Sequence, residues 1–212
     1  STGASGRSVI ANAGGSFFDY LICEGRDTGV TDSVGTARFI NTETVRNSIF
    51  VLRATGADHI IGTGTGSPMF YNCSVVAPDD LATAPTSLFL SGASGTVTVQ
   101  NCGLFAGDST KAIKAGSAIY NFTTCYSDIS GTSGVTQTTY SSEFQNVNDA
   151  TRDFRLKTGA AQIDTGTTDA TNAAIDIANT NRPSGAAYDV GAWEFVPQAV
   201  VNMGWESTGQ WL

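Results

Sequence analysis

Charged residues are scarce in this 212-residue sequence, at 14% against roughly 25% in an average globular protein. Lysine is the rarest of them, since Lys111, Lys114 and Lys157 are the complete set, and the arginines form no basic stripe. The net charge is −8 at pH 7. Because binding to nucleic acid phosphates requires clustered lysine and arginine, we expect no nucleic acid partner.

Long apolar runs and targeting segments are missing as well. No run approaches the roughly 20 apolar residues of a membrane-spanning helix, so we expect no membrane insertion. The first six residues, Ser1 to Gly6, lack the basic and then apolar order of a signal peptide. The end of the sequence, Val200 to Leu212, carries neither an LPxTG-like motif nor an apolar anchor. These features favour assembly inside a cell over attachment to a cell wall.

Motifs for catalysis and metal binding are also lacking. The four cysteines form no CxxC pair, which disfavours a zinc site. The glycine-rich run 62–66 is followed by neither the Lys-Ser/Thr pair nor the helix of a phosphate-binding loop. No Ser-His-Asp order or nucleophile elbow is present. We therefore expect no catalytic residues, no cofactor and no metal.

What the sequence does contain is a repeat of short β-branched and aromatic segments separated by glycine, serine and threonine. Each segment has a large apolar residue, a variable residue, an asparagine, and then a residue that can face inward. The segments are 45–50, 70–75, 99–104 and 119–124, and their asparagines are separated by 25, 29 and 20 residues. Periods of this length indicate stacked repeats, and this composition indicates strands.

Asparagine has a physical role at the third position, because it tolerates the left-handed backbone that β-branched residues avoid. One left-handed residue between two strands makes a sharp bend, so each asparagine is predicted to mark the same corner of a coil. Stacked corners would let the side chains bond in a ladder. The ladder residues are Asn47, Asn72, Asn101 and Asn121. The predicted fold is all-β: a right-handed parallel β-helix, that is, a single-stranded solenoid.

The same register places other residues. Cys73 would stack near Cys102 in the core, either as buried thiols or as a disulfide, since neighbouring strands lie about 4.8 Å apart. Tyr71 and Tyr120 occupy the variable position, which should face outward. They are either glycan-facing residues or ordinary decoration of a strand.

The second half of the chain carries a further pattern, in the segments 144–147, 152–156, 161–166, 176–177, 181–183 and 189–194. Together with 72–75 it resembles the closing region of bacterial and phage parallel β-helix proteins, including those called choice-of-anchor Q domain proteins. The likeness covers about residues 45 to 195. Gln162 stands where the family pattern has proline. The resemblance implies the fold more than any function, because one fold serves many roles.

The resemblance implies one domain over residues 1–195, with a C-terminal cap from about residue 142 and a tail over 196–212. An open solenoid end needs a cap to cover apolar core and unpaired strand edges. Trp193 and Phe195 are expected to cover the last coil. Charged residues are expected to pair across the cap: Arg155, Arg182, Asp164, Asp176 and Asp189. In the tail, Trp205, Trp211 and Leu212 form either a partner interface or a segment packed on its own domain.

Some titratable residues remain as weaker candidates for chemistry. His59 follows Asp58, but neighbouring residues on a strand point to opposite faces, so they form no obvious dyad. Asp79 and Asp80 lie in a predicted loop. Asp108 and Asp128 are 20 residues apart and could be neighbours on adjacent coils. They are either turn or surface residues or, as the alternative, a carboxylate pair of the kind that glycosidases use.

Two functions follow as hypotheses. The first is a non-enzymatic virion structural protein, a phage capsid decoration or a β-helix associated with a tail or fibre, that contacts other virion proteins. The resemblance to phage proteins implies a homo-oligomer, with a trimer favoured. The alternative is a secreted or cell-surface β-helix that binds or cleaves polysaccharide, as a lyase or a hydrolase.

Overall fold

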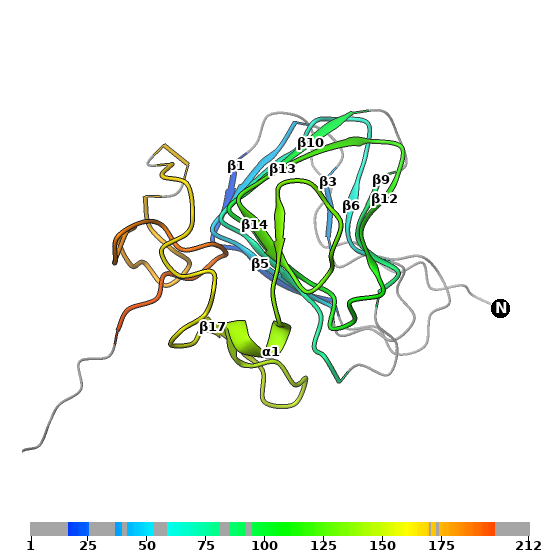
Figure 1. Cartoon of the computed structure of the whole chain (residues 1–212). Coiled ribbons are helices and arrows are strands. Elements are labelled where there is room, and N and C mark those ends of the chain that lie inside the picture. The colour runs from blue at the N-terminus through cyan, green and yellow to red at the C-terminus, as the bar shows by residue number, and fades with distance from the viewer. Residues whose placement is uncertain are drawn as a thin grey trace, which may run out of the picture.

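The computed structural model describes residues 17–25, 37–39, 42–52, 59–80, 85–91, 95–169, 171–172 and 174–197. It confirms the predicted parallel β-helix. The chain winds through three parallel sheets in turn, so that up to β14 each strand pairs with the strand three positions away in the chain; β15 then pairs with β14. Figure 1 shows these coils stacked behind one another.

The first sheet contains β1 (Phe17–Asp19), β4 (Thr44–Arg46), β7 (Met69–Tyr71), β10 (Thr96–Gln100) and β13 (Ile119–Thr123). The second contains β2 (Ile22–Gly25), β5 (Ile49–Leu52), β8 (Ser74–Val76), β11 (Gly103–Phe105), β14 (Cys125–Ser127) and β15 (Val135–Gln137). The third contains β3 (Ala37–Phe39), β6 (His59–Thr63), β9 (Ser87–Ser91) and β12 (Ala112–Gly116). One coil is one strand of each sheet, so β1 to β3 form the first coil and β13 and β14 belong to the fifth.

One corner of the coil, between the first and second sheets, is built from residues with left-handed backbone. Asn47, Asn72 and Asn101 lie there with φ values of 46°, 50° and 52°. The amide N–H of each donates to a carbonyl of the next coil; Asn72, for example, donates to Gln100 at 3.0 Å. Tyr20, in the first coil, has the same conformation with φ of 58°.

The prediction that Asn121 shares this corner is wrong. Asn121 lies exposed in the middle of β13 and pairs with Thr98, whereas Thr124 takes the corner of that coil with φ of 50°. The repeat of the fifth coil therefore runs over residues 122–127 and not 119–124. The chain from the corner of the fourth coil, Asn101, to the corner of the fifth, Thr124, is therefore three residues longer than an alignment on asparagine implies.

Inside the coil, aromatic rings and thiols stack along the axis. Phe39 contacts Phe50 and Phe70 edge to face, with ring centroids 5.8 and 5.3 Å apart, and Phe70 contacts Phe89 in turn. The residue after each corner also faces inward. In three successive coils that residue is a buried free cysteine, namely Cys73, Cys102 and Cys125. Of the two open interpretations, the structure therefore has thiols and no disulfide, and Cys23 is a fourth free thiol.

The C-terminal part of the chain contains α1 (Tyr140–Glu143) and the antiparallel pair β16 (Phe144–Asn146) and β17 (Asp153–Leu156). It forms a layer beside the coil, drawn yellow to orange in Figure 1, and not a cap over its end. We call residues 140–197 the flanking layer. Its apolar side chains cover the outward residues of the second sheet and form a second hydrophobic core with them, including Ile49, Val51, Val76, Phe105, Phe144, Phe154 and Leu156.

The predicted position of the cap, over the last coil, is therefore wrong. The strands of the second sheet, such as β5 and β8, are apolar on both faces, so their outer face needs a cover of its own. Trp193 and Phe195 pack against this second core. The end of the coil is closed instead by the loop after β14 and by β15. Ile129 of the loop joins the inner core, and Val135 at the start of β15 packs against it.

Candidate functional site

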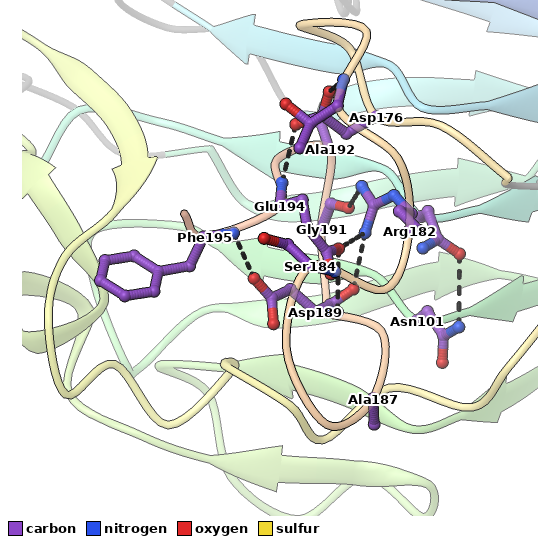
Figure 2. A network of polar contacts seen from close by, with 12 residues as sticks. Asn101, Asp176, Arg182, Ser184, Ala187, Asp189, Gly191, Ala192, Glu194 and Phe195 are labelled. Carbon is purple, nitrogen blue, oxygen red and sulfur yellow. Dashed lines mark hydrogen bonds and ion pairs between the residues drawn. The ribbon is translucent and has the colours of Figure 1, made fainter. Parts of the chain in front are cut away.

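Four charged residues of the closing motifs gather in a buried network within the flanking layer, namely Asp176, Arg182, Asp189 and Glu194 (Figure 2). The guanidinium group of Arg182 donates to Glu194 Oε2 at 2.9 Å, and both side chains are fully buried. The same guanidinium donates to the carbonyl oxygens of Asp189 and Gly191, at 2.9 and 2.8 Å. Arg182 thus holds the segment 189–194 through three hydrogen bonds.

The carboxylates of this network accept hydrogen bonds mainly from backbone amides. Asp176 accepts from the N–H groups of Ala178, Thr180 and Glu194. Asp189 accepts from Asp164 at 2.7 Å and also from Phe195. Burial raises the pKa of both Asp189 and Glu194 and lowers that of Arg182. Since these oxygens bind the chain's own backbone, the network acts as structural support.

Arg155 and Asp164, which were predicted to pair in this region, lie at its margin. Arg155 is exposed and forms an ion pair with Asp153 on its own strand, β17. Asp164 Oδ1 accepts a hydrogen bond from Ala187 at 3.0 Å. Glu194, which receives the buried arginine, was not among the predicted residues, although it stands in the last of the resembling segments.

A groove of about 470 Å³ lies between the first coils and the flanking layer. Its apolar floor is the outer side of β2 and β5, with Ile22, Ile49 and Val51. Its other side is formed by residues 150–154 and by Trp193. A volume in this range is typical of small-ligand sites.

Polar groups stand at the edge of this groove. Arg152 forms an ion pair with Glu24, a residue 128 positions earlier in the chain, and also donates to the carbonyl of Asp149 at 2.8 Å. Asp153 is paired with Arg155, whose hydrogen bonds lower the pKa of its carboxyl group. The indole Nε1 of Trp193 is buried without a hydrogen-bond acceptor among the described residues. The groove thus combines an apolar floor with paired charges, while the Nε1 atom of Trp193 is buried away from it.

The two predicted glycan-facing tyrosines lie in different environments. Tyr71 is half-buried on the outer face of the first sheet, level with Arg46 and Gln100. The prediction that Tyr120 faces outward is wrong, because Tyr120 is buried in the inner core, level with Val97, and stacks on Phe122. The cause is the three-residue shift of register that displaced Asn121.

The two carboxylates on adjacent coils, Asp108 and Asp128, both bond to backbone N–H groups and not to each other. Asp108 accepts hydrogen bonds from the N–H and hydroxyl of Thr110, at 2.9 and 2.7 Å, and these bonds lower its pKa. Asp128 is buried and accepts from the N–H of Ala106 at 3.0 Å, and burial raises its pKa. Asp108 therefore closes a bend of its own segment, as the turn interpretation expects, whereas Asp128 links the fifth coil to Ala106 of the fourth.

The remaining candidates do not join a common site. His59 is buried at the start of β6, and Asp58 lies outside the described residues. Asp79 and Asp80 are exposed, and Asp80 accepts from the N–H of Asp149 in the flanking layer. The predicted interface residues of the tail, Trp205, Trp211 and Leu212, also lie outside the described residues.

Two further findings concern metals and membranes. In the described part of the chain, no group of three or more His, Cys, Asp or Glu side chains is arranged to hold a metal ion. No helix among the same residues has the length and apolar character needed to cross a membrane.

Comparison with known proteins gives no match: no family model, curated protein or solved structure matches this chain.

Proposed function

We propose that this protein is a non-enzymatic structural element of a virion, a capsid decoration or a tail- or fibre-associated β-helix that presents a rigid exposed surface. The proposal for the virion rests on the resemblance of the closing segments to those of phage and bacterial parallel β-helix proteins. The proposal of rigidity rests on one observation, which is that the flanking layer binds the coils along the whole stack.

The contacts of the flanking layer reach successive coils. In the first two coils, Glu24 pairs with Arg152 and Arg46 donates to the carbonyl of Thr171. In the third, Ser74 Oγ accepts from the N–H of Ala192 at 3.0 Å. In the fourth, Asn101 bonds to Thr167 and Gly191, and in the fifth Thr124 bonds to Thr167. A stack braced in this way suits a part that must keep its shape under load.

An assembled virion part is expected to form a homo-oligomer, and we favour a trimer. The test for assembly is size-exclusion chromatography with light scattering on the full 22.0 kDa chain, where a trimer has three times that mass. A monomer at micromolar concentration would contradict the trimer.

The location is tested by quantitative mass spectrometry of purified particles from the virus or prophage that encodes the chain. We expect several copies per particle, at a fixed ratio to the major capsid protein. Absence from particles, together with recovery from the cell-wall fraction or the culture medium, would overturn the proposal.

The second candidate function, which the groove favours, is binding of polysaccharide by a secreted or cell-surface protein. The groove offers apolar side chains beside hydrogen-bonding groups, which is the combination that small-ligand sites use. A glycan array probed with the full chain tests this function. Lack of binding to every glycan would count against it.

A further inference from the structure

We propose that a ladder of buried thiols in the coil binds one soft divalent cation, of which Hg²⁺ is the type, in line between the sulfurs of two successive coils. The ladder consists of Cys73, Cys102 and Cys125, and we call it the thiol ladder. All three thiols are free and fully buried. The proposal is independent of the proposed role in a virion and of the groove.

The three thiols repeat one side-chain geometry. Each cysteine comes directly after the left-handed corner of its coil. In each, the sulfur lies 3.2–3.4 Å from the carbonyl oxygen two residues earlier and 3.4–3.7 Å from a carbonyl oxygen of the preceding coil. Because this geometry recurs in strands stacked about 4.8 Å apart, successive sulfurs are separated by about the same distance.

Contacts between the coils join the thiols to one another. The backbone N–H of Cys73 donates to Sγ of Cys102 at 3.4 Å. The thiol of Cys102 also interacts with those of Cys73 and Cys125, and these interactions add to the effect of burial in raising its pKa. Cys102 is therefore the central member of the ladder, with one thiol on each side.

The spacing of the sulfurs suits an ion that takes two ligands in line. Thiolates select soft metal ions, and Hg²⁺ prefers two thiolate sulfurs on opposite sides. A bond between metal and thiolate is about 2.3 Å long, the value for zinc, so two bonds in line span about 4.6 Å. Structural zinc takes four ligands, whereas the described part of the chain has no group of three or more His, Cys, Asp or Glu side chains that suits a metal.

The charge of the complex decides between divalent and monovalent soft ions. When Hg²⁺ binds, two S–H bonds break, two S–Hg bonds form and two protons leave to the solvent, so the core stays neutral. A monovalent ion such as Ag⁺ bound in the same way leaves one negative charge. That charge would lie in a buried site lined by carbonyl oxygens, where an anion is disfavoured.

The position of Cys102 sets the number of ions. Both possible pairs, Cys73 with Cys102 and Cys102 with Cys125, use the same central sulfur, so the neutral complex forms once per chain. Cys73 and Cys125 are two coils apart, about 9.6 Å, which is too far for one ion to join them. Loss of either end thiol therefore leaves a pair, and loss of Cys102 leaves none.

The experiment loads the ion while the full chain folds, because the thiols of the folded coil are buried. Reduced protein is refolded from urea with one equivalent of HgCl₂ and then desalted in excess glutathione. Glutathione removes ions held by one thiol, since only a preformed pair gains from binding at two points of one molecule. We expect mass spectrometry to find about one mercury atom per chain, and mercury–thiolate absorption in the ultraviolet.

Cysteine variants then locate the ion. Cys73→Ser and Cys125→Ser should each retain mercury, whereas Cys102→Ser should lose it. Cys23→Ser is the matched control, because Cys23 is also a buried free thiol but lies on β2, beside Phe50 and outside the ladder. Serine fits this position, since the buried Ser48 occupies it in the second coil, and Cys102→Ala is a second variant should Cys102→Ser fail to fold.

An arm with AgNO₃ tests the charge argument. Exchange against the same thiol competitor removes the intrinsic strength of the bond between metal and sulfur from the comparison. The exchange constant for Ag⁺ should be lower than that for Hg²⁺ by more than about tenfold, because silver leaves a buried charge. Equal constants would contradict the neutral complex.

The other outcomes also decide the proposal. Mercury that is retained by both folded Cys102 variants, or that is lost in Cys23→Ser, overturns it, and so does a native chain that retains none. Loss of mercury in only one of the two end variants supports the proposal and assigns the ion to a single pair.

Discussion

The side-chain amide of Asn101 donates a hydrogen bond to Oδ1 of Asn72, one coil away, across 3.3 Å. The same side chain donates to the carbonyl of Thr167 at 2.6 Å and accepts from the N–H of Thr167 at 2.9 Å. Asn101 therefore joins two coils to each other and to the flanking layer, from a corner that requires left-handed backbone.

Replacing Asn101 should therefore be costly for two separate reasons. In Asn101→Ala the groups that bond to the asparagine side chain lose their partner. Alanine also tolerates the left-handed backbone less well than asparagine. We therefore expect the free energy of unfolding to fall by about 2–4 kcal/mol. Asn101→Gly relieves the backbone alone and should recover about 1 kcal/mol. Urea denaturation measures both. Asn121→Ala is the control, because Asn121 is exposed in mid-strand, and it should change stability by less than about 0.5 kcal/mol.

The buried ion pair of Arg182 and Glu194 gives a second prediction. In Arg182→Met, Glu194 stays buried without its partner, so stability should fall by about 3–5 kcal/mol. The double variant Arg182→Met/Glu194→Met should recover part of this loss, because it removes both charges. Thermal melting compares the three proteins. Arg155→Met removes the exposed partner of Asp153 and should leave the melting temperature nearly unchanged; a drop equal to that of Arg182→Met would refute the distinction.

The buried carboxyl group of Asp128 makes stability depend on pH. Burial raises its pKa in the folded state above the ordinary value of 3.8, so the folded chain holds this proton more tightly than the unfolded chain. The stability that Asp128 contributes is therefore full below 3.8 and is lost as pH rises through the folded pKa. In Asp128→Asn, which keeps the acceptor for Ala106, this part of the pH profile should flatten. Denaturation from pH 3 to 7 checks it; identical profiles would contradict the prediction.

The cysteines can be counted chemically. All four thiols are free and buried, and burial raises the pKa of Cys23 and Cys102, which disfavours the reactive thiolate. Ellman's reagent should react with almost no thiol in the native protein and with four after denaturation. Release of only two thiols from the unfolded, unreduced chain would show a disulfide and contradict the structure.

Two glycines in the loop that closes the coil form a matched pair. Gly131 and Gly134 both have positive φ, at 84° and 77°. A Cβ on Gly131 meets nothing within 4 Å, whereas one on Gly134 would lie 2.0 Å from the carbonyl oxygen of Phe122. Gly131→Ala should lower the free energy of unfolding by about 1–2 kcal/mol, because alanine disfavours the left-handed backbone. Gly134→Ala should lower it clearly more, because its Cβ also meets the Phe122 carbonyl. Equal shifts in melting temperature would show that Gly134 is not packed against the coil.

Much of the coil was predictable because its corner is a local feature. A left-handed residue between two short strands has a recognisable sequence, and three of the asparagines marked it. The fifth coil was misread because Thr124 replaces asparagine at its corner. The signal was nevertheless present, since Cys125 follows Thr124 as Cys73 and Cys102 follow their asparagines. An alignment on cysteine would have placed Tyr120 in the core.

The flanking layer and the groove were less predictable for a physical reason. Strand 49–52 is buried on both faces, but nothing in its local sequence says which segment covers the outer face of the second sheet. The groove depends on Arg152 meeting Glu24, which lie 128 residues apart in sequence. Such pairings follow from the packing of the layer as a whole and leave no pattern in either segment.

The flanking layer also changes how the chain should come apart. Solenoids can lose their repeats one after another from an end, because each repeat contacts only its neighbours. Here, detaching the first coil breaks the bond between Glu24 and Arg152, and detaching the fifth breaks that between Thr124 and Thr167, so fraying at either end loosens the same segment. Melting should consequently be a single all-or-none event and not a gradual unzipping.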